Sequence, residues 1–478
     1  MTRSRDFDVT FPLTDYLPEA PAPARSVPEP ARDVPVIADC DVAVLGGGPA
    51  GVCAAAAAAR AGRRVVLVER CGCLGGMATI AGVNVWHKLL GADDATAVIG
   101  GLVAEAVERL RALDAVEETH LHHFIFCSET AKFVFDDLAV GSGVRLLLHT
   151  LLAGAVRAGD RVVAAIVEGK SGRGAIVAET FIDATGDADL VRRAGGETQL
   201  GDAGGRCQPP GLCCRARGRT DGAMPLNRVQ AQLFREPMDY NGRRYPTFLW
   251  GNPSVRDKAE HMVCGTRILG VNVADTRDLT RAEVEGRYQL RWVLGKLREQ
   301  PGWEAATLVD VAAQVGTRES HRILADHQLT RAEVLEGRRF DDAVAQGTYP
   351  IDIHNPDGPG ILFERLDGTW TRVAGDGAVT KGRWDGAADG APARDTLCYG
   401  IPYRCLVPRG LSNVLAAGRC AGAEHDAAGA VRVMVNCMQL GQAAGTAAAM
   451  LPPAANVRDV DAGQLRARLI ADGAPLLP

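Results

Sequence analysis

Three glycines early in the chain have the spacing of a phosphate-binding turn. Gly46, Gly48 and Gly51 form a G-x-G-x-x-G pattern. An apolar run at 42–45 predicts a strand before them, and an alanine-rich stretch predicts a helix at about 50–61. Because glycine has no side chain, the backbone can turn sharply and bring its N–H groups to a pyrophosphate, which the positive end of the helix dipole also attracts.

An acidic residue completes this pattern. A second strand is predicted at 64–68, and Glu69 follows it at about the 20-residue offset where an acid accepts hydrogen bonds from ribose hydroxyls. A strand-turn-helix without a ligand is the alternative interpretation. The order of strand, glycines, helix, strand and acid favours a dinucleotide site.

The residues after Glu69 indicate which dinucleotide is bound. They read RCGCLGGMAT and contain a second glycine pair, for which a nicotinamide-dependent enzyme has no general need. The chain resembles the FAD-dependent oxidoreductases of the glutathione-reductase-like class, in particular the branch related to fumarate reductase and succinate dehydrogenase flavoproteins. The resemblance runs from about residue 40 to 470 and is carried, in order, by GGGPAG, LGGMAT, FIDATGDADL, GTRESHRI, YPIDIH, YGIPYRCLVP, NVLAAGRC and LGQAAGTAAA.

The resemblance implies a set of FAD-binding residues. It assigns the pyrophosphate to the first glycine turn, the adenosine ribose and its surroundings to the acid and its neighbour, and adenine to a backbone contact in HTLLAGAV. It also implies that a helix starts at 439–445 and directs its N–H groups at the flavin N1/C2 edge. The residues so assigned are Gly46, Gly48, Pro49, Ala50, Gly51, Glu69, Arg70, Gly75, Gly76, Thr79, Leu152, Thr185, Gly186, Asp187, Gly418, Arg419, Gln439, Leu440 and Gly441.

The resemblance also suggests residues that face the substrate. His425 follows the flavin-side turn, where related flavoproteins carry a substrate-facing histidine, and Arg432 could complement an anionic group. Arg318 and Arg404 are further candidates for the catalytic site, together with Tyr403 and Arg322. A buried ion pair with Glu319 or another acid is the alternative role for Arg318. Glu424 and Ala430 depart from the hydroxyl residues expected beside the histidine, and most other histidines, including His122 and His123, are expected at the surface or in packing.

The residues around the second glycine pair also indicate how the flavin is attached and whether the nearby cysteines form a disulfide. No histidine directly follows the glycine pair, so noncovalent FAD is expected, with Cys71, Cys73 and His87 as the residues that could attach it. Cys71 and Cys73 are too close for the CxxxxC-like spacing of a redox-active disulfide. The thirteen cysteines form no pair of CxxC units, and we expect no metal site and reduced thiols in a cytoplasm.

The order of the expected strands and helices, which position these residues, predicts an α/β fold. We expect a Rossmann-like FAD-binding domain, a parallel sheet with a small β-meander layer, into which an α+β substrate domain is inserted. The expected division is an arm at 1–38, an FAD-binding domain at 39–86, 136–204 and 396–452, a substrate or cap domain at 87–135 and 205–395, and a C-terminal segment at 453–478.

Two echoing segments in the middle of the chain predict helix starts. In DLTRAEVEGR and QLTRAEVLEGR, Thr280 and Thr330 are each followed three residues later by a glutamate, Glu283 or Glu333, as in a capping box. The Gly- and Asp-rich stretch at 366–394 predicts a loop or hairpin tip.

Composition narrows the range of functions. With 478 residues, 47% hydrophobic residues and a formal charge of -5, we expect a cytoplasmic protein without a nucleic-acid or membrane partner, and a homodimer is a reasonable expectation. The function that we expect is two-electron, hydride-type oxidation or reduction of a small organic substrate at flavin N5, with diffusible NAD(P)H or O₂ as electron partner. An FAD-dependent monooxygenase and a non-catalytic flavin-binding or RNA-modifying subunit are the alternatives.

Overall fold

The computed structural model describes residues 26–220, 222–233, 238–240, 243–245, 249–374, 378–383 and 397–477. Of the arm predicted at 1–38, residues 1–25 lie outside these ranges, residues 26–35 form no helix or strand, and the first strand begins at Val36. Parts of the loop predicted at 366–394, namely 375–377 and 384–394, also lie outside the described residues.

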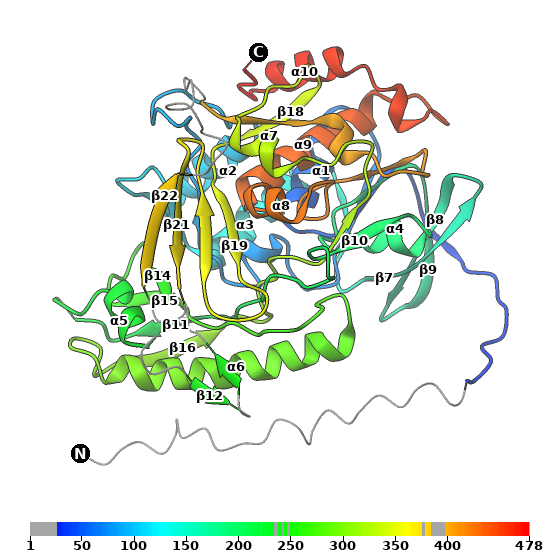
Figure 1. The fold of residues 1–478 in the computed structure, drawn as a ribbon. Helices are drawn as coiled ribbons and strands as arrows, with labels where there is room; N and C mark the ends of the chain where they lie inside the picture. The colour runs from blue at the N-terminus through cyan, green and yellow to red at the C-terminus, as the bar shows by residue number, and fades with distance from the viewer. Residues whose placement is uncertain are drawn as a thin grey trace.

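A seven-stranded sheet forms the centre of the fold (Figure 1). Its parallel part joins β6, β2, β1, β9 and β24, and β7, β8 and β9 form an antiparallel meander at one side. The predicted α/β class with a Rossmann-like parallel sheet is therefore confirmed. The strands in spatial order are β6 (Arg145–Leu147), β2 (Val65–Val68), β1 (Val36–Leu45), β9 (Gly172–Asp183), β8 (Arg161–Gly169) and β7 (Leu151–Ala158), with β24 (Val414–Ala416) beside β9.

Alternate residues of β1 face opposite sides of this sheet, because side chains along a strand alternate in direction. Val42 and Val44 pack on the side of helices α1, α2, α3 and α9, whereas Ala43 and Leu45 pack on the side of α4. All four residues of β2 are buried, as is typical of a parallel strand covered on both faces. The helices are α1 (Pro49–Arg60), α2 (Leu102–Ala112), α3 (Ser128–Val140), α4 (Asp189–Arg193) and α9 (Met434–Met450).

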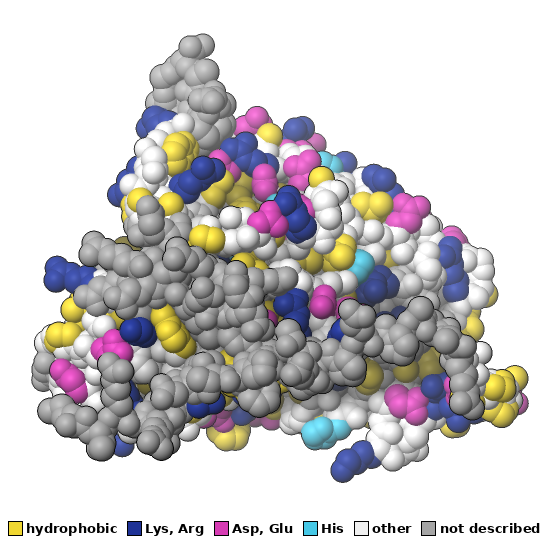
Figure 2. All heavy atoms as spheres, turned by 60° about the horizontal axis from the view of Figure 1, so that its bottom comes forward, with side chains coloured by type: hydrophobic (Ala, Val, Ile, Leu, Met, Phe, Trp, Pro, Cys, Tyr) yellow, Lys and Arg dark blue, Asp and Glu magenta, His cyan; other side chains and the backbone are white. Residues whose placement is uncertain are grey.

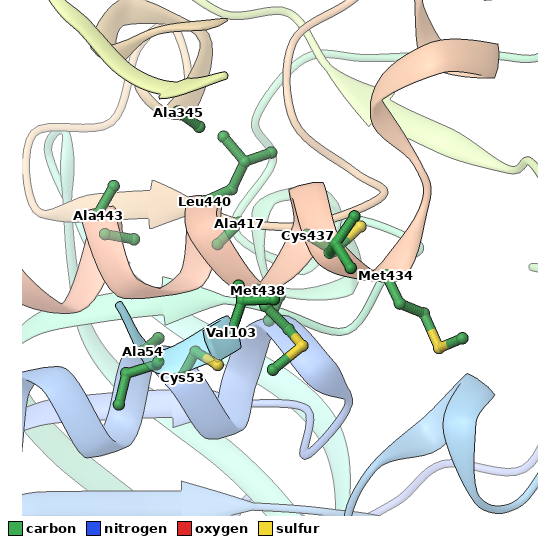
Figure 3. Packing of buried hydrophobic residues seen from close by; sticks show 14 of the residues in the cluster. Cys53, Ala54, Val103, Ala345, Ala417, Met434, Cys437, Met438, Leu440 and Ala443 are labelled. Atoms are coloured by element: carbon green, nitrogen blue, oxygen red, sulfur yellow. The ribbon is translucent and has the colours of Figure 1, made fainter. Parts of the chain in front are cut away.

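Helices α1 and α9 approach each other closely through small residues (Figure 3). A Cβ added to Gly441 would lie 2.0 Å from the Ala50 carbonyl oxygen, and one added to Gly445 would lie 2.1 Å from that of Ala54. Helix α9 begins at Met434, so the prediction that a helix starts at Gln439 is wrong. The apolar run before Gln439 continues the helical pattern toward the N-terminus, and this places the open end of the helix more than a turn earlier.

A second, four-stranded sheet lies apart from the first. It is flanked by the long helix α6, which runs along the bottom of Figure 1. A separate hydrophobic cluster that includes Leu212, Val263 and Val293 fills the space between this sheet and the helix. The elements are β14 (Trp250–Pro253), β15 (Glu260–Cys264), β11 (Cys213–Arg217), β16 (Thr307–Val311) and α6 (Thr276–Arg298).

Smaller elements complete the described part of the chain. The hairpin formed by β21 and β22 falls within the stretch predicted as a loop or hairpin tip. The strands are β3 (Val85–Trp86), β4 (Val116–Glu118), β5 (Phe124–Phe126), β10 (Thr198–Leu200), β12 (Met238–Tyr240), β13 (Arg243–Tyr245), β17 (His321–Ile323), β18 (Ala343–Gly347), β19 (Ile351–His354), β20 (Ile361–Glu364), β21 (Thr369–Val373), β22 (Val379–Arg383) and β23 (Tyr399–Pro402). The helices are η2 (Gly76–Ala78), α5 (Leu226–Leu233), α7 (Arg331–Leu335), η4 (Tyr403–Leu406), α8 (His425–Val431), η5 (Val457–Asp459) and α10 (Ala462–Ala471).

Only one of the two echoing segments starts a helix at its threonine. Thr330 caps α7 and forms the predicted capping box with Glu333. Thr280 lies inside α6 instead, where its hydroxyl donates to the Thr276 carbonyl, so the prediction of a helix start at Thr280 is wrong. Asp275 precedes it by more than one turn and accepts hydrogen bonds from two backbone N–H groups, which moves the start of the helix to that residue.

None of the helices in the described part of the chain combines the length and the apolar character that crossing a bilayer requires. Figure 2 shows one face of the molecule, on which Lys and Arg side chains are interspersed with Asp and Glu over the described residues. The absence of a nucleic-acid partner stays a prediction.

Candidate active site

One cavity of about 410 Å³ connects the glycine turn with the second sheet. Its walls come from segments that are far apart in the sequence: the ends of β1, β2 and β9, the turn after β24, the start of α9, and strands β3, β11, β15 and β19. The strand ends at this position are where open parallel sheets bind ligands.

The first glycine turn shapes one end of the cavity. Gly46 has φ +103°, and a Cβ added there would lie 2.4 Å from the Ala184 carbonyl oxygen. A Cβ added to Gly51 would lie 1.7 Å from the Gly46 carbonyl oxygen, so this glycine allows the helix to approach the strand. Gly48 precedes α1 and lines the cavity, and no side chain caps this helix end. Its first backbone N–H groups are therefore available to an anion.

The carboxylate of Glu69 is held beside this turn. Its Oε2 accepts a hydrogen bond from the Gly47 N–H at 2.7 Å, and its Oε1 accepts one from the Cys71 N–H at 2.8 Å. Each carboxylate oxygen can accept a further hydrogen bond, and Glu69 lines the cavity. The arrangement suits a ribose with two hydroxyl donors.

A third turn closes this end of the cavity. Arg419 donates to Asp187 Oδ1 at 2.7 Å and to the Ser320 hydroxyl at 2.8 Å. Gly186 has φ +81°, and a Cβ added there would lie 2.7 Å from the Arg419 guanidinium. The ion pair between Arg419 and Asp187, together with the absence of a side chain at Gly186, thus allows the turn after β9 to pack against the turn after β24.

Most of the residues predicted to bind the cofactor lie in the cavity wall. Those that line it are Gly46, Gly48, Pro49, Ala50, Glu69, Arg70, Gly76, Thr185, Gly186, Asp187, Gly418 and Arg419. The others are placed behind it: Gly51 packs on Gly46, Gly75 and Thr79 shape the second glycine turn, Leu152 lies in β7, Gln439 binds the backbone of Gln346, and Leu440 and Gly441 lie in the body of α9.

A family model described as FAD dependent oxidoreductase matches residues 41–469. The chain belongs to the FAD-dependent oxidoreductases. It is an enzyme with FAD as its cofactor, and the cavity fits this dinucleotide: the turn without side chains and the open helix end suit the pyrophosphate, and Glu69 suits the ribose.

Solved structures of flavoproteins and related proteins are similar to this FAD-dependent oxidoreductase over most of its length. The geranylgeranyl bacteriochlorophyll reductase-like protein of Thermoplasma acidophilum is 12% identical, with 91% of this chain and 83% of that chain covered and a TM-score of 0.42. The anhydrotetracycline hydroxylase OxyS of Streptomyces rimosus is 13% identical, with 91% of this chain and 65% of that chain covered and a TM-score of 0.39. No curated protein matches the chain.

The far end of the cavity in this oxidoreductase contains a buried polar cluster around Asp352 in β19. Its Oδ2 accepts hydrogen bonds from the Tyr349 hydroxyl and the Arg432 guanidinium, both at 3.0 Å, and its Oδ1 lies 3.3 Å from His354 Nε2. Arg318 lies in the same wall and donates to the Pro209 carbonyl at 2.7 Å. The cluster holds two arginines and one carboxylate at the cavity surface.

Burial and charge set the protonation states of this cluster. Burial alone would raise the pKa of Asp352, but the interaction with His354, which includes a hydrogen bond that a neutral imidazole can donate, and the charges of Arg432 and Arg318 outweigh it, and the net pKa is lowered. Burial, with repulsion from Arg267 and Arg318, holds the pKa of His354 well below its usual value. Near neutral pH the cluster therefore presents an ionised Asp352 and a neutral His354.

Two further histidines, His87 and His123, lie close to Tyr349. The ring of His87 is 4.1 Å from the Tyr349 ring and 5.1 Å from that of His123, and both histidines line the cavity. Burial lowers the pKa of His87 to about 3. The expectation that His123 is only a surface or packing residue therefore needs correction, because it belongs to the cavity wall.

Two predicted catalytic residues lie elsewhere. His425 begins α8, and its Nδ1 lies 2.8 Å from Glu319 Oε1 in a buried cluster with Arg322, outside the cavity lining. Arg404 is half exposed and pairs with Asp342 at 2.9 Å, also outside the lining. Arg404 is therefore held by an ion pair, and His425 is held by its contact with Glu319. The alternative role of Arg318 does not hold among the described residues, because Arg322 pairs with Glu319 and no other carboxylate lies within ion-pair distance of Arg318.

The sequence motifs contain a signal for the residues that were missed. YPIDIH carries Tyr349, Asp352 and His354, and its alternating polar positions indicate a strand with one polar face. Because the motif lies far from both glycine turns in sequence, the pattern alone assigns no role to it.

Proposed function

We propose that this enzyme catalyses the two-electron, hydride-type oxidation or reduction of a small organic substrate that carries an anionic group. The observation that supports the proposal is the continuity of one cavity from the glycine turn to the cluster around Asp352. FAD supplies a reversible two-electron centre when it is bound. The chain's own residues then have to bind the substrate and handle its proton.

Arg318 and Arg432 are the substrate-binding groups in this proposal. Arg432 is neutralised by Asp352, whereas Arg318 has no carboxylate within ion-pair distance among the described residues. Arg267 lies buried behind them; burial and then repulsion from Arg318 lower its pKa to about 9, so it stays charged at neutral pH. This excess of positive charge favours a carboxylate or another anion at the cavity wall.

His354 is the group that takes or returns the substrate proton in this proposal. It is neutral and lines the cavity, so it can accept a proton, and the adjacent Asp352 carboxylate stabilises the imidazolium that forms. Tyr349 keeps its proton, because burial and the Asp352 charge raise its pKa well above the usual value, and it donates to Asp352. The phenol thereby fixes the carboxylate.

The finer parts of this assignment belong to the proposal as well. They are noncovalent binding of FAD, the relation to the fumarate reductase branch, the division into an FAD-binding domain and a substrate domain at 87–135 and 205–395, and a diffusible nicotinamide or oxygen as electron partner. The YPIDIH motif, which carries the cluster, is among the residues that support the relation to that branch.

Anaerobic stopped-flow spectroscopy tests the proposal. The FAD-loaded protein is mixed with a panel of small hydroxy, amino and saturated carboxylates, and the chemically reduced protein with unsaturated carboxylates. We expect a donor to bleach the flavin absorbance without NAD(P)H, or an unsaturated acid to restore it. Bleaching by NAD(P)H alone, with oxygen uptake and a hydroxylated product, would show a monooxygenase, and no response to any compound would show a non-catalytic flavin protein.

A further inference from the structure

Two cysteines face each other across neighbouring strands of the second sheet. Cys213 in β11 and Cys264 in β15 are directly opposite in the antiparallel register, and both are free thiols. Opposite residues in such a pair have Cα atoms about 4.5–5.5 Å apart. That separation lies within the range of about 4.4–6.8 Å that a disulfide requires, so the backbone can accept an S–S bond.

Both thiols belong to the wall of the FAD cavity. Cys213 and Cys264 are only 2% and 3% exposed, and both line the cavity. They share one face of the sheet with Met262. Cys214, the next residue of β11, packs on the opposite face in the cluster with α6. The strand therefore presents one thiol to the cavity and the next to a hydrophobic core.

The surroundings favour a thiolate on one member of the pair. The hydrogen bond from Cys213 and the charges of Arg318 and Arg267 lower the pKa of Cys264, although burial opposes them. Burial instead raises the pKa of Cys214, which has no such neighbours. The thiolate is the reactive form of cysteine in disulfide chemistry.

We propose that Cys213 and Cys264 form a redox-active dithiol that exchanges two electrons with the FAD of this cavity. Oxidation breaks both S–H bonds, forms one S–S bond and releases two protons and two electrons. FAD accepts these electrons and protons and becomes FADH₂, and the reverse reaction restores both thiols. The pair has no CxxxxC-like spacing, because strand pairing rather than sequence proximity brings it together.

The proposal rests on FAD binding at this cavity and not on the hydride-type reaction or its substrate. An anaerobic titration with dithionite therefore tests it without any substrate. The FAD-loaded protein is first oxidised with diamide, and the electrons taken up per FAD are counted. We expect four electrons in the wild type, two for FAD and two for the disulfide. Uptake of only two electrons by the wild type would overturn the proposal.

Matched variants locate the additional electrons. Cys213→Ala and Cys264→Ala are each expected to take up two electrons per FAD, whereas Cys214→Ala, the buried neighbour on the other face, is expected to take up four. If Cys214→Ala lost the additional pair and Cys213→Ala kept it, the assignment would be wrong.

Peptide mapping gives a readout that needs no variant. After alkylation and digestion with trypsin, the oxidised wild type should yield peptide 207–215 linked to peptide 259–267, in which Cys264 is the only cysteine. Prior reduction of the holoenzyme with dithionite should release both peptides in alkylated form. Recovery of both cysteines as alkylated thiols from the oxidised protein would contradict the proposal, whatever the outcome of the donor panel.

Discussion

At the scale of single residues, the candidate site consists of side chains that line one cavity from different strands. Asp352 is ionised because charged neighbours outweigh its burial, and it is held by Tyr349, Arg432 and His354. Arg318 has no comparable carboxylate partner among the described residues, so its charge can act on a ligand as well as on Cys264. The site therefore combines a fixed anion with an open cationic position.

Replacing Arg318 should weaken substrate binding. A charge-assisted hydrogen bond contributes about 1.5–3 kcal/mol, so Arg318→Gln should raise KM for an anionic substrate about tenfold or more, with a smaller change in kcat. Steady-state kinetics with a donor found in the panel measures both constants. Arg404→Gln is the matched control, because Arg404 binds Asp342 outside the cavity. Equal changes of KM in both variants would argue against the binding role of Arg318.

Two histidines can be compared to test the proton-transfer role. His354→Asn should lower kcat by about 10²-fold or more, as is typical for the loss of a general acid or base. His425→Asn should change kcat little, because His425 pairs with Glu319 outside the cavity lining. The FAD content and the thermal unfolding of both variants are measured alongside. A large loss of kcat in His425→Asn with none in His354→Asn would reverse the assignment.

At the scale of elements, patterns in the sequence predict those helices, strands and turns that are determined by residues close together in the chain. The glycine turn, its two flanking strands and α1 follow from apolar runs and glycines that are close in sequence, and their predicted boundaries lie near those observed. The start of α9 is also a local feature, because the apolar run before Gln439 continues the helical pattern. The position of His425 could not be predicted in this way, because it depends on packing against the distant segment around Glu319.

The two echoing segments also show that a local motif does not always predict where a helix starts, and their helix caps can be tested. Thr330→Ala should destabilise the protein by about 0.5–2 kcal/mol, because the cap of α7 is lost. Thr280→Ala should have a smaller effect, since Thr280 lies within α6 and only its hydroxyl bond to Thr276 is removed. Chemical denaturation measures both free energies of unfolding. A larger loss for Thr280→Ala would show that the local motif does not determine the cap.

At the scale of the whole molecule, strand order assembles the site. β24, which comes late in the chain, joins the central sheet beside β9, and the second sheet contributes the opposite wall of the cavity. Composition and motifs predict the cofactor end, because its turns follow directly from strands. The substrate end draws on strands that no local pattern connects, so its residues emerge only from the fold.

Buried histidines predict how the stability of the whole molecule depends on pH. Burial, with repulsion from Arg219, lowers the pKa of His261 to about 4, whereas an unfolded histidine titrates at about 6.5. Between these values the unfolded chain binds a proton that the folded chain does not, so stability falls as the pH is lowered from about 6.5 to about 4. His261→Phe should reduce this slope, whereas replacing the exposed His120 by Phe should not. Denaturation midpoints across this range test the prediction, and equal slopes in all three proteins would contradict it.

If one cavity holds FAD at one end and an anion at the other, binding of an anion should change the flavin spectrum. The oxidised, FAD-loaded protein is titrated with malonate, and the flavin absorbance is followed. We expect a saturable spectral change in the wild type and in Arg404→Gln that is strongly weakened in Arg318→Gln. No spectral change in the wild type, or an equal change in Arg318→Gln, would contradict this arrangement.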